Sequence, residues 1–250
     1  MSIRTLPMTR LVRSEWIKIR SVRAVTGSLA AIFVATLTAT VAVFATVGQS
    51  DASGPDFEPV FSAFYALNFA QVAAINFGAT ALASEYANGS LGIWLAAVPR
   101  RSLLYGAKMS VIGALALLVG LLTSFATFLV GQSFMGDHAI GLGHPGALRA
   151  AVGGGAHLAL MALAAAGLTA VLRNAAVVLG LLIPVLLVAS FVLGDVAGNV
   201  AQYLPFQAGQ LVLHESPQGG MGPWVGLAVA GAWSAAALMA GWWCMKRRDA

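Results

Sequence analysis

Charged residues are scarce in this sequence. Asp, Glu, Lys and Arg make up 9% of its 250 residues, whereas a soluble domain carries about 25%. Hydrophobic residues make up 59%, and the mean hydropathy is +0.83. Water therefore cannot be the main solvent of the chain. Its apolar runs are continuous rather than alternating, which favours membrane-spanning helices over a β-barrel.

Cysteine is almost absent as well. The single cysteine, Cys244, cannot form a disulfide within the chain,. It lies in the last apolar run, where we interpret it as a packing residue.

Motifs for catalysis and phosphate binding are missing. No Gly-x-x-x-x-Gly-Lys-Ser/Thr phosphate loop occurs, so we expect this chain to bind no ATP, Mg²⁺ or other cofactor,. No predicted span holds an Asp or Glu that could bind and release a proton or sodium ion, which disfavours coupling to an ion gradient. His-Glu-x-x-His and Gly-x-Ser-x-Gly motifs are absent too. We predict that the chain is not an enzyme, and that energy for any uphill transport comes from a partner.

Six apolar runs are long enough to cross a membrane. A hydrocarbon core of about 30 Å takes roughly 20 helical residues. We therefore predict an all-α membrane protein that forms a single transmembrane domain over residues 1–250. The six predicted spans are residues 24–47, 59–83, 109–134, 150–172, 174–193 and 223–245.

The basic residues predict the orientation of these spans. All but Arg149 of the 14 Lys and Arg residues lie before the first span, between the second and third, between the fourth and fifth, or after the sixth. Because Lys and Arg are retained on the cytoplasmic side, we expect a multi-pass protein of the plasma (inner) membrane with both termini in the cytoplasm. Basic residues that flank spans do not form a soluble patch, so we expect the lipid bilayer and not nucleic acid as a partner.

Residues 8–23 predict an amphipathic helix that lies along the inner leaflet, because their apolar residues share one arc at helical spacing,. Glu15 falls inside that apolar arc. A carboxylate that faces lipid is costly, so two interpretations stay open. Glu15 contacts either a protein partner or Lys18 one turn away.

The segment between the second and third spans, residues 84–105, has an apolar core from Leu91 to Val98. This core is too short to cross a bilayer, and Pro99 ends any helix that it forms. We interpret it as a plug that fits a socket on another protein. A re-entrant or interfacial helix buried against its own bundle is the second interpretation.

Amide side chains in the second span need hydrogen-bond partners in hydrocarbon. Asn68 and Gln71 stand one turn apart, and Asn76 lies farther along, among aromatic residues that include Phe64. Residue type favours packing against neighbouring helices, and the alternative is a polar and aromatic wall of a substrate cavity. Pro184 is expected to kink the fifth span. The candidate substrate pathway therefore consists of Phe64, Asn68, Gln71, Asn76 and Pro184.

The segment between the fifth and sixth spans, residues 194–222, is long for a connection between helices and partly apolar,. Residues 203–213 predict either a short re-entrant helix that dips into the outer leaflet and caps a pathway or a surface loop held by its own side chains.

Three motifs follow one another along the chain. The first is Ser14-Glu15-Trp16-Ile17-Lys18-Ile19-Arg20-Ser21. The second is Glu85-Tyr86-Ala87-Asn88-Gly89-Ser90-Leu91, followed by Ala97-Val98-Pro99-Arg100-Arg101. The third is Tyr203-Leu204-Pro205 with Ala208-Gly209-Gln210. In this order they resemble the connecting helix, the coupling segment and the outer re-entrant element of the permease subunits of ABC exporters in the ABCG-like (type V) class, especially those of actinobacteria. The sequence departs at Ser90, where threonine is commoner, and at Phe206-Gln207, where Ser-Asn is frequent.

The resemblance implies a dimer of permeases, identical or paired with a similar chain. It also implies two separate ATPase subunits, which hold ATP and Mg²⁺ and sit beneath the coupling segments. The ATPase-coupling residues that it implies are Glu85, Tyr86, Gly89, Ser90, Leu91, Trp94, Leu95, Pro99, Arg100 and Arg101. Those of the connecting helix are Glu15, Trp16, Lys18 and Arg20, and those of an outer gate are Tyr203, Pro205 and Phe206.

The leading hypothesis is outward transport of an amphipathic or hydrophobic substrate, such as a drug, antibiotic, peptide or lipid. ATP binding to the partner would move the segment from Glu85 to Arg101 and, through it, the second and fifth spans. Two other classes stay open. One is a membrane scaffold or immunity protein that sequesters a peptide or lipid without transport, and the other is a proton-coupled carrier.

Overall fold

The structure is a computed structural model that describes Trp16 and residues 23–51, 58–87, 101–191, 202–215 and 220–247. Across these ranges the regular elements are helices, with no β-strand, so the prediction of an all-α chain is confirmed. In chain order they are α2 (Arg23–Asp51), α3 (Pro59–Ala63), α4 (Leu67–Ala87), α6 (Arg101–Ser133), η1 (Gly136–His138), α7 (Ala147–Leu172), α8 (Ala175–Phe191), α10 (Pro205–Gln210), η3 (Leu211–Leu213) and α11 (Pro223–Arg247).

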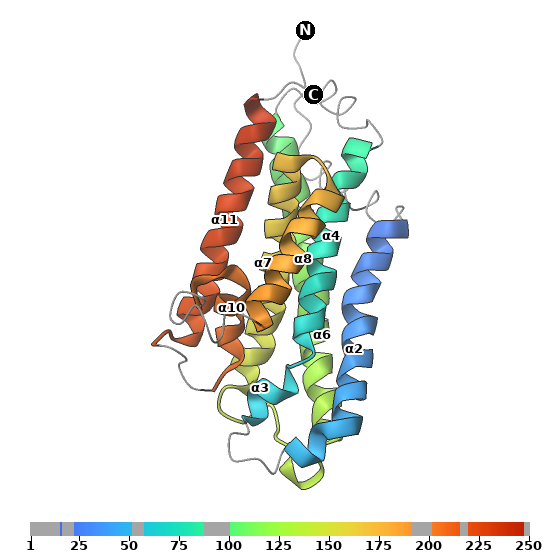
Figure 1. Cartoon of the computed structure of the whole chain (residues 1–250), viewed down its shortest axis with the longest axis vertical. Coiled ribbons are helices and arrows are strands. Elements are labelled where there is room, and N and C mark those ends of the chain that lie inside the picture. Colours follow the sequence, from blue (N-terminus) through green and yellow to red (C-terminus); the bar gives the residue numbers. More distant parts are fainter. Residues whose placement is uncertain are drawn as a thin grey trace.

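The long helices run side by side along one axis (Figure 1). We call the end where α2 begins and α4 and α11 finish the basic end, because Lys108, Arg173, Lys246 and Arg247 lie near it. The other end carries the short elements α3 and α10, and we call it the α10 end.

Four helices are long and apolar enough to cross a membrane: Arg23–Thr46, Ser102–Ser133, Ala147–Leu172 and Pro223–Arg247. A fifth apolar stretch, Ala175–Leu187, is shorter. At 21 residues α4 is long enough, but its three amides lower its hydropathy. The chain is therefore a membrane-integral helical protein.

The second predicted span, residues 59–83, is wrong as a single helix. It is broken between α3 and α4, where Phe64 has φ −104° and ψ 7° and ends α3. Tight turns carry the chain across the break, since the N–H of Leu67 donates to the carbonyl of Phe64 at 2.9 Å. Hydropathy did not reveal the break, because every residue in it is apolar or aromatic.

The boundaries of the predicted segment 84–105 also need correction. Residues 84–87 belong to α4 and residues 101–105 to α6. The prediction placed Glu85 and Lys108 outside the spans, but these two charges pair with each other between α4 and α6, so neither ends its helix. Residues 88–100 lie outside the described residues.

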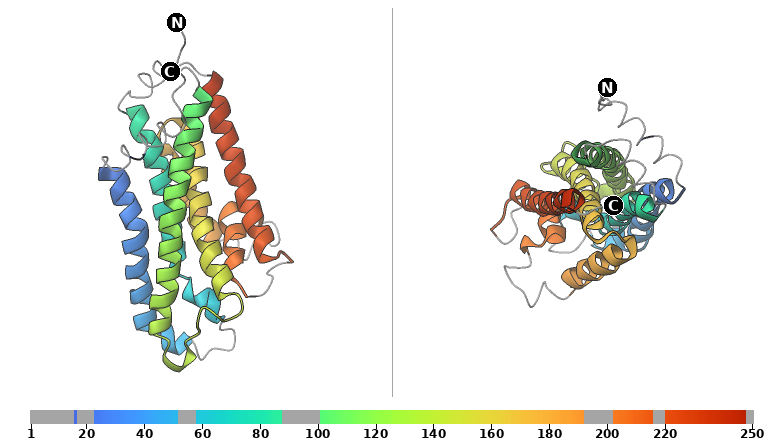
Figure 2. Two further views of the ribbon diagram at one scale, coloured as in Figure 1. Left: turned by 180° about the vertical axis from the view of Figure 1, so that it is seen from behind. Right: turned by 90° about the horizontal axis from the view of Figure 1, so that it is seen from above.

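The centre of the bundle is α7, which packs against α4, α6, α8, α10, α11 and η3. The view along the axis in Figure 2 shows it flanked by α6, α8 and α11. Small residues allow this close approach. A Cβ added to Gly78 of α4 would lie 1.9 Å from the carbonyl oxygen of Ala162, and one added to Gly167 would lie 2.6 Å from the backbone of Ala237.

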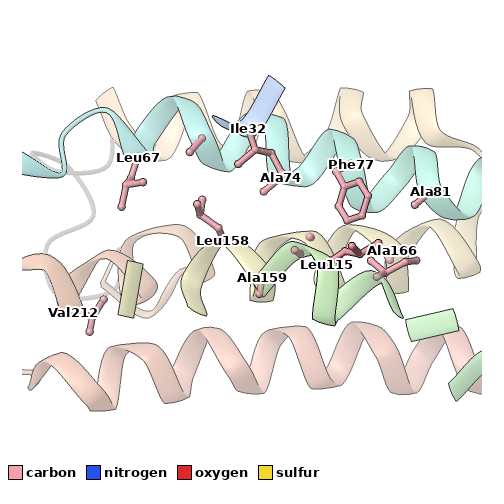
Figure 3. Packing of buried hydrophobic residues seen from close by; sticks show 14 of the residues in the cluster. Ile32, Leu67, Ala74, Phe77, Ala81, Leu115, Leu158, Ala159, Ala166 and Val212 are labelled. Atoms are coloured by element: carbon pink, nitrogen blue, oxygen red, sulfur yellow. The ribbon is translucent and has the colours of Figure 1, made fainter. Parts of the chain in front are cut away.

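The hydrophobic core is formed mainly by α4, α6 and α7, with a contribution from α2. Figure 3 shows Leu67, Ala74 and Phe77 of α4 facing Leu158 and Ala159 of α7. The outward faces of the surrounding helices are apolar as well, with exposed Val34 and Val41 on α2 and exposed leucines on α6. In a membrane protein such faces contact lipid.

The two ends of α11 carry tryptophans that mark its depth in a membrane. Trp224 is exposed near its first residue, and Trp242 and Trp243 are exposed near its last. Lys246 lies 4.4 Å from the ring centre of Trp242, and Arg247 lies 4.3 Å from that of Trp243. From Trp224 to Trp242 the helix rises about 27 Å. This rise fits a hydrocarbon layer bordered by aromatic side chains on both sides.

Candidate functional site

A chain of polar side chains crosses the core near the α10 end. Asn68 Oδ1 accepts two hydrogen bonds, from Gln71 Nε2 at 3.2 Å and from Gln210 Nε2 at 2.7 Å. Gln71 Oε1 lies 3.2 Å from Nε2 of His157. The chain therefore ties α4 to α10 on one side and to α7 on the other.

The hydrogen bond to Gln71 assigns the tautomer of His157. An amide oxygen can only accept, so Nε2 of His157 carries the proton and donates it. The other nitrogen, Nδ1, is then an acceptor, and it has no hydrogen-bond partner among the described residues. The backbone of α10 covers it closely, since a Cβ added to Gly209 would lie 1.9 Å from Nδ1. His157 is 2% exposed, so it is a buried core residue that anchors the polar chain.

A cavity of about 410 Å³ opens beside this chain. The wall from α8 is apolar, the wall from α4 combines Asn68 with apolar side chains, and a third wall carries the amides of α10. A volume of this size with mixed walls fits an amphipathic small molecule. The lining residues are Tyr65, Asn68, Phe69, Val72, Leu186, Leu187, Gln207, Gln210, Leu211 and His214.

The structure places only one of the predicted pathway residues in the lining of the cavity. Asn68 lines the cavity, and Gln71, 1% exposed, lies behind it. Phe64 is fully buried and stacks on Phe128, with ring centres 5.6 Å apart. Asn76 is partly buried and Pro184 is exposed on α8, and neither is among the cavity-lining residues.

The predicted outer gate forms a short helix, and its core is not a surface loop. Pro205 begins α10, where its fixed φ suits the first turn,. Phe206 is buried, whereas Tyr203 is exposed and its carbonyl accepts a 3.0 Å hydrogen bond from Nε1 of Trp233. Close packing holds the element in place, because a Cβ added to Gly226 of α11 would lie 2.2 Å from the carbonyl oxygen of Ala208.

Histidine and carboxylate side chains join α3 to the segment after η3. His214 Nδ1 lies 2.9 Å from Oε2 of Glu58, and the ring of His214 stacks on Phe61 at 4.1 Å. The next residue, Glu215, accepts a hydrogen bond from the N–H of Val60 at 3.3 Å and lies 3.6 Å from Nε2 of His144. The sequence did not predict this cluster, because its members come from three distant segments.

At the basic end, two contacts hold the last turn of α4. Glu85 forms a buried ion pair with Lys108 of α6. The guanidinium carbon of Arg173 lies 5.8 Å from the ring centre of Tyr86. Arg173 is the first of two residues between α7 and α8, so the end of α4 is held by α6 and by the α7–α8 turn.

Most of the other predicted coupling and connecting residues lie outside the described residues. Trp16 is helical and exposed, and Arg101 begins α6. The predicted residues outside the description are Glu15, Lys18, Arg20, Gly89, Ser90, Leu91, Trp94, Leu95, Pro99 and Arg100.

Metal chemistry finds no support in the residues that the structure describes. They contain no group of three or more His, Cys, Asp and Glu that could hold a metal ion. Cys244 is buried and free.

Comparison with known proteins assigns the family. No curated protein matches the chain. The model of the ABC-2 family transporter protein domain matches residues 11–192, which is more than half of the sequence. The chain therefore belongs to the ABC-2 transporter family, whose members are membrane permeases that work with an ABC ATPase.

Proposed function

We propose that this chain is the permease subunit of an ABC exporter of the ABCG-like (type V) class, and that it moves an amphipathic or hydrophobic substrate outward. ATP and Mg²⁺ would be held by a separate ATPase subunit. The basic end faces the cytoplasm, α4 with α3 and α8 complete a set of six spans, and two permeases, identical or similar, form the working unit.

The observation that carries this proposal is the cavity between α4, α8 and α10. Its walls combine aromatic and aliphatic side chains with three amides, which suits a substrate that has both an apolar body and a hydrogen-bonding group. The polar chain through Asn68 joins the cavity wall to α10. Movement of α4 would therefore change the cavity and its cover together.

The charges at the two ends support the proposed orientation. Lys108, Arg173, Lys246 and Arg247 lie near the basic end, and Glu58 and Glu215 lie at the α10 end. Arg149 is the exception, and it donates a hydrogen bond to the carbonyl of His214.

The test of the cavity is a substitution at Asn68 with a matched control on the same helix. Asn68→Ala removes an oxygen that accepts two hydrogen bonds beside the cavity. Asn76→Ala removes the same group from a position that does not line the cavity. The chain and the ATPase that co-purifies with it are reconstituted in liposomes, and transport of rhodamine 6G and of a fluorescent phosphatidylethanolamine is measured.

We expect Asn68→Ala to raise the half-saturating concentration of the transported probe about tenfold, as the loss of one or two hydrogen bonds would. Asn76→Ala should change it by less than about twofold. Equal effects of the two substitutions would show that the cavity is not part of the substrate pathway. If no ATPase co-purifies, or if neither probe moves on ATP addition, the exporter proposal is wrong and a scaffold that sequesters a peptide or lipid takes its place.

A further inference from the structure

The last turn of α4 carries two side chains that are held by cations from other helices. Oε1 of Glu85 pairs with Nζ of Lys108, which lies 23 residues later on α6. The next residue, Tyr86, offers its ring to Arg173 at 5.8 Å. These contacts fix the position of α4 immediately before the segment of residues 88–100.

Burial of this ion pair does not by itself stabilise the protein more than an apolar pair would. Glu85 is 7% exposed and Lys108 is 3% exposed, so both charges have lost most of their water. An apolar pair of similar volume is often as stable as a buried ion pair, because desolvation offsets the attraction. What the ion pair adds is a defined geometry, since the carboxylate and the ammonium group must meet. It therefore sets how α4 lies against α6.

The backbone conformation of Arg173 supports the same interpretation of this end of α4. Its φ of 56° and ψ of 17° are left-handed, and it is the only non-glycine residue with positive φ in the described part of the chain. Glycine or asparagine usually occupies such a position after a helix, because a larger side chain is strained there. Arginine occupies this position despite the strain, and its guanidinium lies over Tyr86.

One rigid helix links these contacts to the cavity. Glu85 and Tyr86 lie at one end of α4, and Asn68 and Phe69 line the cavity at the other. At about 1.5 Å per residue, Glu85 and Asn68 are about 26 Å apart along the helix. A displacement at the basic end is therefore passed along α4 to the cavity wall.

We propose that Lys108 and Arg173 are positioning residues that clamp the end of α4 to α6 and to the α7–α8 turn, so that movement driven by the ATPase reaches the cavity. This inference rests on the proposed function and adds two residues to it. It also assigns Glu85 a role within the permease, as the partner of Lys108, rather than as a contact with the ATPase.

The test uses the full chain in its complex with the co-purifying ATPase and reports movement at the cavity without the need for a known substrate. Cys244→Ser removes the single cysteine, and Phe69→Cys places a bimane label at an exposed position of the cavity wall. ATP with vanadate then traps the ATPase, and the change in bimane fluorescence is recorded. The amount of ATPase bound to the permease is measured in parallel.

Three variants and one control are compared in this labelled background. Lys108→Met and Glu85→Gln each remove one charge of the pair. Arg173→Asn removes the cation but suits the left-handed backbone, so it should leave thermal stability unchanged or raised. Lys246→Asn is the matched control, because it removes a cation that also lies over an aromatic ring, on a different helix of the same end.

We expect the fluorescence response to be lost in Lys108→Met, Glu85→Gln and Arg173→Asn, with as much ATPase bound as in the parent. The control should respond like the parent. A normal response in Arg173→Asn or in Lys108→Met overturns the inference, and so does a loss of bound ATPase in Glu85→Gln with a normal response in Lys108→Met. If Lys108→Met does not fold, the fluorescence response of Arg173→Asn decides whether the inference holds. If the parent itself binds no ATPase or gives no response, the proposed function fails before any variant is compared.

Discussion

Individual polar residues in this bundle differ in their contribution to stability, although they are similarly buried. His157 and Thr127 are both buried, on α7 and α6. His157 donates to Gln71, whereas the hydroxyl of Thr127 has no hydrogen-bond partner among the described residues. Leaving a buried acceptor without its donor lowers the free energy of unfolding, whereas removing a hydroxyl that has no partner breaks no hydrogen bond.

This difference makes a prediction for stability. His157→Leu leaves the oxygen of Gln71 without its donor and should lower the free energy of unfolding by about 1–3 kcal/mol. Thr127→Val, which keeps the shape of the side chain, should change it by less than about 0.5 kcal/mol or raise it. Thermal unfolding in detergent measures both. An equal loss in the two variants would show that hydrogen bonding does not distinguish these positions.

The helices approach each other where side chains are smallest. Gly78 of α4 faces the backbone of Ala162 in α7, and Gly155 of α7 faces the backbone of Leu121 in α6. Backbone atoms cannot move aside as a flexible side chain can, so these glycines set the distances between helices. The position of α4, which carries the cavity wall, depends on one of them.

Gly78→Ala tests this dependence. The added Cβ would lie 1.9 Å from the carbonyl oxygen of Ala162, so α4 must shift, and we expect a loss of about 1–3 kcal/mol in the free energy of unfolding. Gly27→Ala makes the same change in α2, where a Cβ would meet nothing within 4 Å. There the better helix propensity of alanine should leave stability unchanged or raised by up to about 1 kcal/mol. If both variants unfold at the parent's temperature, the crossing of α4 and α7 tolerates side chains and the assignment is wrong.

Across the whole molecule, charge is distributed between two ends and scarce between them. Basic side chains gather where α6 begins and α11 ends, and carboxylates gather around α3 and η3. The proposed orientation places the basic end in the cytoplasm, where positive residues are retained during insertion. It also places residues 88–100 on the side where an ATPase binds.

Labelling of intact cells tests this orientation. In the Cys244→Ser background, Gly143→Cys lies in the loop at the α10 end, and Ile93→Cys lies beside Trp94. We expect a membrane-impermeant maleimide to label the cysteine at 143 in intact cells and the cysteine at 93 only after the membrane is opened. Labelling of the cysteine at 93 from outside would show that the topology is inverted and would contradict the exporter proposal.

The membrane location of this chain can be predicted from its amino-acid sequence alone. Scarce charge, long apolar runs and basic flanks are local properties, and each can be recognised without knowing which helices meet. For the same reason the family resemblance was visible in short motifs, and the model of the ABC-2 family confirms the permease family. The pair Asn68 and Gln71 was recognisable as well, because both lie on one turn of one helix.

Which polar groups form hydrogen bonds with one another depends on how the helices pack. Asn68 and Gln210 are 142 residues apart, and Gln71 and His157 are 86 apart. No periodicity links such positions. Their contact depends on how closely α4, α7 and α10 pack, and that distance is set by glycines whose role appears only when a neighbouring backbone lies against them. The burial of α10 and the ion pair of Lys108 with Glu85 also depend on helix packing, because each joins segments that are far apart in the sequence.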